Sequence, residues 1–120
     1  MDLFGVTDAV VEVGLQGTEL RQQVLSNNLA NANTPGFKPG DVQFGSQLAE
    51  ALAFGDSASQ ISQIQPTTST DTSVMRVDGS GIDVNREATA LAQNAMQYEA
   101  LMGVETKNLT TMSNLITGAR

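Results

Sequence analysis

The sequence contains no histidine, no cysteine and no tryptophan. Without His and Cys, the chain has no Ser–His or Cys–His nucleophile pair, no thiolate metal ligand and no disulfide. Aromatic residues are scarce as well, with four Phe and one Tyr, so a bulky globular core is not expected. No complete glycine-rich phosphate cradle or dinucleotide fingerprint is present. We therefore predict that the chain is not an enzyme and that it needs no cofactor and no metal.

The sequence also contains few basic residues. Six Lys and Arg residues stand against 13 Asp and Glu residues, which gives a net charge of −7 over 120 residues. A chain this acidic, with no Lys/Arg cluster, is not expected to bind nucleic acid. It has no apolar run of about 18 residues, so no direct membrane insertion is expected. The first five residues carry neither a basic nor an apolar signal region, so Sec-type export is not expected, although other export routes stay open.

Two long apolar stripes with alternating spacings of three and four residues stand out, one at each end of the chain. This spacing keeps one face of a helix turned toward a partner helix, as in coiled coils, so both stripes are predicted to be helix-packing interfaces. The N-terminal stripe lies in a helix predicted over residues 3–31 and consists of Val6, Val10, Val13, Leu20 and Val24. The C-terminal stripe lies in a helix predicted over residues 84–117 and consists of Val84, Leu91, Ala95, Tyr98, Met102, Leu109, Met112 and Ile116.

The region between the helices, residues 32–83, is predicted to contain a turn, a short helix and a linker. Pro35-Gly36 is the favoured centre of a type II turn. Apolar residues at helical spacing predict a helix over residues 43–53, which Phe54-Gly55 ends. Residues 55–73 are rich in Ser, Thr and Gln, and we expect a mobile linker there because so few apolar side chains cannot offset the entropy of ordering. A short strand is predicted at 74–77.

A second turn at residues 78–81 is followed by Asp83, the predicted N-cap of the last helix. The whole chain, residues 1–120, is predicted to be a single, mainly α domain whose long N- and C-terminal helices pair as a coiled coil. Further apolar residues widen each stripe, so each helix needs more than one neighbour. We therefore expect a subunit that becomes fully ordered only inside an assembly.

An asparagine-rich motif ends the first predicted helix. Asn favours caps and turns because its side chain bonds to nearby backbone groups. A helix stop explains two of the four asparagines, and the others either belong to that stop or bond to the backbone of a neighbouring chain. The motif consists of Asn27, Asn28, Ala30, Asn31, Asn33, Pro35, Gly36 and Phe37.

This motif closely resembles the N-terminal signature of the bacterial flagellar rod, hook and related axial proteins. Residues 41–44, 78–87 and 97–101 are similar to those of the short, proximal-rod members. The resemblance implies a structural subunit of the proximal rod of the flagellar basal body, part of the drive shaft that transmits torque. It also implies that the terminal helices pair in an inner coiled-coil layer. The chain would then be exported through the flagellar type III apparatus without a cleaved signal, and it would become part of a rod that spans the periplasm.

The partners that the resemblance implies are other rod proteins, components at the base of the basal body, and further copies of the chain itself. One alternative is another small rod subunit of the same superfamily. A different class of protein, an acidic helical adaptor or secretion chaperone, is also compatible with the composition. The asparagine motif favours the rod, because a chaperone does not need an amide cluster that ends in Pro-Gly.

Overall fold

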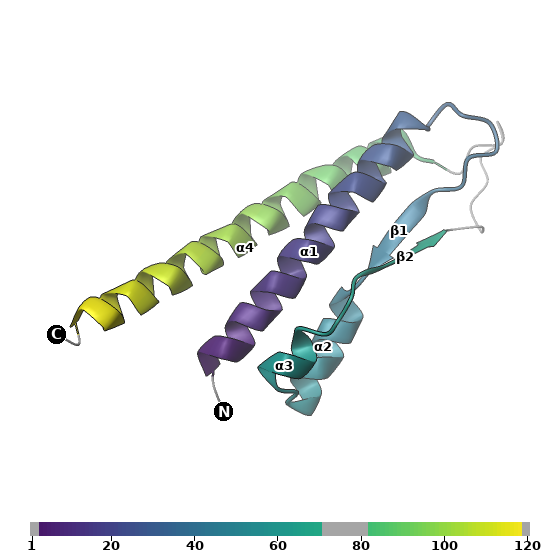
Figure 1. Ribbon diagram of the computed structural model, residues 1–120. Coiled ribbons are helices and arrows are strands. Elements are labelled where there is room, and N and C mark those ends of the chain that lie inside the picture. Colours follow the sequence, from purple (N-terminus) through teal and green to yellow (C-terminus); the bar gives the residue numbers. More distant parts are fainter. Residues whose placement is uncertain (1–2, 71–81, 119–120) are drawn as a thin grey trace.

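The computed structural model describes residues 3–70 and 82–118. Two long helices run side by side in opposite directions (Figure 1), and both are the helices that the sequence predicts. They are α1 (Leu3–Ala30) and α4 (Val84–Gly118). The segment between them forms β1 (Gly40–Gln43), α2 (Gly45–Phe54), α3 (Ala58–Ile61) and β2 (Thr67–Thr70). The fold is therefore mainly α, as predicted, and elongated, with extents of 66 × 26 × 16 Å.

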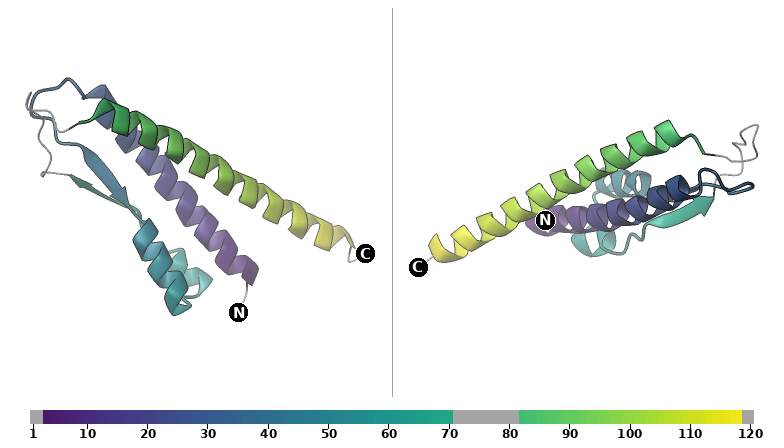
Figure 2. Two further views of the ribbon diagram at one scale, coloured as in Figure 1. Left: turned by 180° about the vertical axis from the view of Figure 1, so that it is seen from behind. Right: turned by 90° about the horizontal axis from the view of Figure 1, so that it is seen from above.

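Helix α1 occupies the centre of the molecule. It has α4 on one side and residues 40–70, here called the middle segment, on the other (Figures 1 and 2). The hydrophobic core cluster lies between α1 and the middle segment. Its buried members are Ala9, Val13, Ala51 and Ile61, with Val6, Val10, Leu48, Ala58 and Ile64 packed around them.

The prediction of a linker without structure over residues 55–73 is wrong for helix α3 and strand β2. Ser57 caps α3 by accepting a hydrogen bond from the Gln60 N–H, and the Gln60 side chain accepts one from the Ser57 N–H, which completes a capping box. Helix α3 places Ile61 in the core, where it is 0 % exposed. Burial of this side chain against α1 contributes about 1.5–3 kcal/mol, which helps to offset the ordering cost of the segment.

Strand β2 pairs with β1 as an antiparallel two-stranded sheet. The register places Gly40 opposite Thr70 and Gln43 opposite Thr67. On β1, Val42 is buried, whereas all four residues of β2 are exposed. Strand β2 is thus held by the backbone ladder and by its β-branched threonines, which favour extended structure. The strand predicted at 74–77 and the turn predicted at 78–81 lie outside the described residues.

Three local predictions are confirmed. The Phe37 N–H donates to the Thr34 carbonyl at 3.3 Å and Gly36 has a φ of 74°, the geometry of a type II turn with glycine at its third position. Helix α2 ends at Phe54, and Gly55 follows it with a left-handed φ of 74°. Asp83 Oδ1 accepts hydrogen bonds from the N–H groups of Asn85 and Arg86 and so caps α4.

The approach of the middle segment to α1 depends on Gly17. A Cβ built on Gly17 would lie 2.5 Å from the Phe44 ring, so the aromatic ring rests where a side chain would otherwise stand. The Arg21 guanidinium lies 4.8 Å from the centroid of the same ring and donates a hydrogen bond to the Val42 carbonyl at 3.1 Å. Phe44 is therefore held between a glycine and an arginine on the same helix.

This geometry predicts that Gly17→Ala destabilises the chain, although Gly→Ala in a helix normally stabilises it. The matched control is Gly103→Ala in α4, where no atom lies within 4 Å of the added Cβ. We expect the control to gain about 0.5–1 kcal/mol from helix propensity. Gly17→Ala should lose about 1–3 kcal/mol because the Phe44 ring must move. Urea unfolding followed by circular dichroism measures both, and equal gains would show that Phe44 does not pack on Gly17.

Candidate assembly interface

Asn28, from the asparagine-rich motif, connects three elements of the chain. Its Nδ2 donates to the Gly40 carbonyl at 2.9 Å and to Glu87 Oε2 at 3.1 Å, and its Oδ1 accepts from the Gly40 N–H at 2.9 Å. The side chain is 1 % exposed. It therefore fixes β1 and the first turn of α4 onto α1. The bonds that the sequence suggested to a neighbouring chain are, for Asn28, bonds within its own chain.

The remaining motif residues lie around the end of α1. Asn31 Nδ2 donates to the Asn27 carbonyl at 2.9 Å and to Asn27 Oδ1 at 3.2 Å, and the Thr34 hydroxyl donates to Asn31 Oδ1 at 3.2 Å. These bonds satisfy groups that a helix end leaves without intrahelical partners, so Asn31 acts as a local stop. Phe37 is half-buried, and the others are exposed: Ala30, Asn33, Pro35 and Gly36.

Asparagine side chains of α4 form hydrogen bonds to α1. Asn94, 2 % exposed, is the one buried residue that α4 contributes among the described residues, and its Nδ2 donates to the Thr18 carbonyl at 2.8 Å and to Gln22 Oε1 at 3.0 Å. Asn108 donates to Asp8 Oδ1 at 3.2 Å. Buried hydrogen bonds of this kind fix the position of a helix but contribute only about 0.5–1.5 kcal/mol each. Helix α4 is therefore positioned on α1 while most of its large apolar side chains stay exposed.

Small residues on α1 allow this contact to be close. A Cβ built on Gly14 would lie 3.0 Å from Leu101 Cδ1 of α4, so the leucine side chain packs directly over the glycine. A larger residue at position 14 would require the Leu101 side chain to shift by a few tenths of an ångström.

The α4 residues that face α1 recur at every seventh position. This spacing is the signal that the sequence analysis missed, because only apolar residues were counted there. A seven-residue spacing places amide, carboxylate and leucine side chains on one face of a helix, just as it does for apolar side chains. The residues are Glu87, Asn94, Leu101 and Asn108, here called the polar heptad although they include one leucine.

The N-terminal stripe packs against the middle segment. Val6, Val10 and Val13 surround the core that Ala51 and Ile61 complete. Further along α1, a Cβ built on Gly40 would lie 3.0 Å from Val24 Cγ1, so Val24 contacts β1. Leu20 is half-buried. This stripe therefore covers α2, α3 and β1, and the face of α1 that bonds to α4 is a different one.

The C-terminal stripe is largely exposed in the single chain. It lies beside the polar heptad on α4, and only Leu91 among its members is half-buried, with Ala95 exposed. Exposed fractions reach 59 % for Leu109 and 70 % for Ile116. A row of large apolar side chains along one helix face is typical of an interface with another protein. The other exposed members are Val84, Tyr98, Met102 and Met112.

Within residues 3–70 and 82–118, no group of three or more Asp and Glu side chains is arranged to hold a metal ion. In the same residues, none of the helices combines the length and the hydropathy that crossing a bilayer requires.

Comparison with known proteins links these features to a family. A family model described as "Flagella basal body rod protein" matches residues 12–38, which include Asn28 and the type II turn. The flagellar basal body rod protein FlgB of Bacillus subtilis is 32% identical, with 100% of both chains covered. FlgB of Escherichia coli is 26% identical over 80% of this chain and 82% of its own length. FlgB of Borrelia hermsii is 25% identical over 97% and 99% of the two chains.

The Asn28 geometry predicts that Asn28→Ala destabilises the isolated chain. The substitution leaves the Gly40 N–H and carbonyl without their partner, and we expect a loss of about 2–4 kcal/mol. Asn33→Ala, at an exposed asparagine of the same motif, is the matched control and should change stability by less than about 0.5 kcal/mol. Urea unfolding and hydrogen exchange of the Gly40 amide measure the effect. Unchanged unfolding and exchange in Asn28→Ala would contradict the role of this side chain in the fold.

Proposed function

This chain belongs to the FlgB family of flagellar basal body rod proteins, and we propose that it is built into the proximal part of the rod as a structural subunit that helps to transmit torque. The exposed C-terminal stripe is the observation that carries this proposal. An apolar stripe at heptad spacing that is largely exposed in the described chain has the form of a surface for another helix. Within a rod, that helix belongs to a neighbouring subunit.

The division of α4 into two faces supports this role. Its polar heptad positions the helix on α1 within the chain, and the neighbouring C-terminal stripe stays available. Burial of an exposed Leu, Met or Ile side chain contributes about 1.5–3 kcal/mol, so several such residues supply a strong contact between subunits. We propose that the predicted interface residues of α4, from Val84 to Ile116, form this contact, and that the whole chain acts as one rod-subunit domain.

The same proposal includes partners and location. The relatives are named as basal body rod proteins, which supports a place in the flagellar basal body and assembly with other rod components. We propose further that the neighbours include copies of this chain and components at the base of the basal body, and that the chain reaches a periplasm-spanning rod through the flagellar type III apparatus. A structural role also agrees with a sequence that lacks His and Cys.

Leu109→Asp tests the interface. Leu109 is 59 % exposed, so the charge meets solvent in the isolated chain and should leave its helical content unchanged. Buried between subunits, the same unpaired charge costs several kcal/mol, so we expect incorporation to fall more than tenfold. Thr111→Asp is the matched control, because it adds the same charge in the same turn on the opposite side of α4.

The measurement is the amount of each variant in basal bodies purified from cells that lack the native protein, together with swimming in soft agar. We expect Thr111→Asp to be incorporated and Leu109→Asp to be found in the cell but not in the rod. Equal incorporation of the two variants would mean that the C-terminal stripe is not buried between subunits.

A further inference from the structure

The C-terminal stripe has a symmetric spacing along α4. From Leu91 to Ile116 its positions are separated by 4, 3, 4, 3, 4, 3 and 4 residues, a sequence that reads the same from either end. Position 105 belongs to this spacing and carries a glutamate. The same stripe on a second copy that runs in the opposite direction therefore meets every one of these positions. The twofold axis of such a pair passes between residues 103 and 104.

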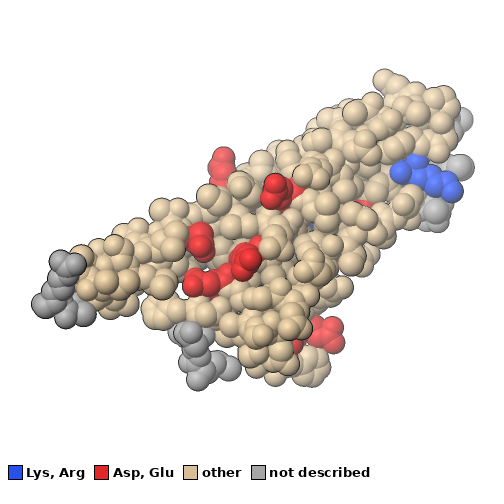
Figure 3. Space-filling view, viewed as in Figure 1, with Lys and Arg blue, Asp and Glu red and all other residues tan. Residues whose placement is uncertain are grey.

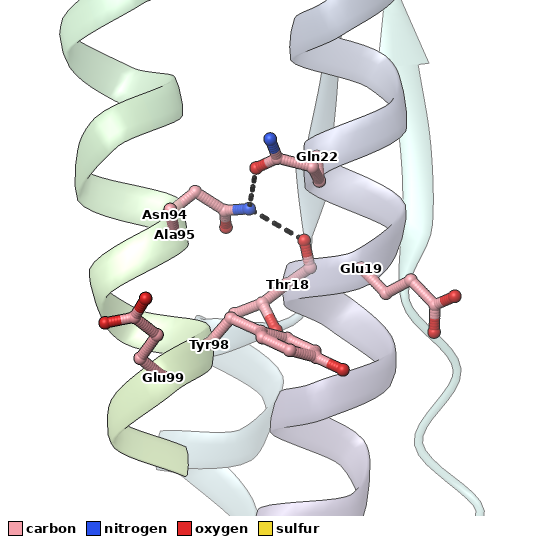
Figure 4. A pocket seen from close by; sticks show the side chains of 7 residues that line it. All are labelled: Thr18, Glu19, Gln22, Asn94, Ala95, Tyr98 and Glu99. Atoms are coloured by element: carbon pink, nitrogen blue, oxygen red, sulfur yellow. Dashed lines mark hydrogen bonds between the residues drawn. The ribbon is translucent and has the colours of Figure 1, made fainter. Parts of the chain in front are cut away.

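The side chains that face each other in this pair have complementary sizes. Ala95, the smallest member of the stripe, faces Met112, whose unbranched side chain adapts to irregular gaps. A groove of about 240 Å³ opens between α1 and α4 beside Ala95, with the Tyr98 ring lying across it (Figure 4). The surface of this groove is almost wholly apolar, so it suits Met112 of a second copy. The other facing pairs are Leu91 with Ile116, Tyr98 with Leu109, and Met102 with Glu105.

The charges along α4 favour the antiparallel direction. Between residues 88 and 105 the charged side chains are Glu99 and Glu105, and between residues 106 and 118 Lys107 is the one charged side chain. The antiparallel pair places Lys107 of each copy opposite residue 100 of the other, next to Glu99. A parallel pair in register instead places Glu99 beside Glu99 and Glu105 beside Glu105, where like charges repel.

The molecular surface agrees with this division of charge. Acidic side chains lie over the middle of the face drawn in Figure 3, and the described last turns of α4 show none on that face. In the antiparallel pair these last turns, which carry the large apolar residues Leu109, Met112 and Ile116, lie along the groove of the other copy. Both the apolar surface and the charge of one half of the stripe are therefore complementary to the other half.

We infer that, outside a rod, the C-terminal stripe is covered by a second copy of this chain, with the two α4 helices antiparallel. Both copies use the same residues, so the contact is closed by its twofold axis and adds no third copy through this stripe. The dimer must separate before the stripe can meet a neighbour in a rod, so self-association competes with incorporation. The inference concerns the chain outside the rod and does not rest on the proposed function.

Introduced cysteines test the direction of the pair, because the natural chain contains none. Ala95→Cys and Met112→Cys chains are mixed under mild oxidation, and disulfide-linked dimers are separated and identified by mass spectrometry. In the antiparallel pair the two residues numbered 95 lie about 25 Å apart, and a disulfide needs Cα atoms within about 7 Å. We therefore expect the mixed dimer to form at least about tenfold faster than either chain links to its own kind.

The matched control replaces Met112→Cys with Asn114→Cys, an exposed position on the opposite side of α4. This chain should not link to the Ala95→Cys chain above the level of random collision. Links within one kind of chain that form as fast as the mixed dimer would indicate a parallel pair and overturn the inference. Equal linking of the control, or no linking of any pair, would overturn it as well.

A charge swap tests the pairing of Lys107 with Glu99. Sedimentation equilibrium of the full chain should give a dissociation constant on the order of 100 µM, because Glu105 at the centre of the stripe keeps the contact weak. Lys107→Glu should raise this constant about fivefold, and Glu99→Lys combined with Lys107→Glu should return it to within about twofold of the natural value. Lys38→Glu, an exposed position outside α4, is the control with the same net charge as Lys107→Glu and should leave the constant unchanged.

Circular dichroism verifies that each variant keeps its helices. A swap that does not restore the dissociation constant, or a Lys38→Glu chain that weakens as much as the Lys107→Glu chain, would show that general charge and not this pairing controls self-association. None of these measurements in solution decides the Leu109→Asp test in cells, so failure of the dimer and failure of the rod interface are distinguishable.

Discussion

The arrangement of the chain depends on one buried amide. Asn28 bonds to both backbone groups of Gly40 and to Glu87, so it fixes β1 and α4 relative to α1 at the same point. A side chain at position 40 would force Val24 to shift, since a Cβ there would lie 3.0 Å from Val24 Cγ1. Once β1 is fixed, Phe44 comes to rest on Gly17 and α2 begins directly after it. The asparagine-rich motif thus organises the fold of a single chain and not only the end of its first helix.

The two long helices have different physical roles. Helix α1 carries the hydrophobic core, because its apolar residues meet α2 and α3, and it also bonds to α4 on another face. Helix α4 contributes one buried residue among those described, an asparagine, and keeps most of its large apolar side chains exposed. In a family of rod proteins this division has an advantage, because the contact within the chain and the proposed contact between chains use separate faces of α4. The two contacts therefore do not compete for the same side chains.

The sequence predicted those structural features that depend on interactions between residues close together in the chain. The two long helices, the Pro35-Gly36 turn and the Asp83 cap depend on residues close in sequence, and all were found. Periodicity identified the faces of the stripes but not their neighbours, since a spacing does not specify which element covers a face. The partners of Asn28 lie 12 and 59 residues away, a relation that no local pattern encodes. Helix α3 was missed although Ser57 and Gln60 have the capping-box spacing, because the polar composition around them dominated the prediction.

The last turns of α4 extend beyond the end of α1, as Figures 1 and 2 show. After Asn108, which bonds to Asp8, all described residues of α4 are exposed. A helix end without tertiary contacts frays. When a neighbour packs against it, the contact must therefore offset the entropy that is lost as the helix end becomes ordered. A subunit that adds to an existing surface gains that packing at once, whereas two free subunits that meet in solution gain less of it. If the proposed contact between subunits forms, growth at a template would therefore be favoured over spontaneous nucleation in solution.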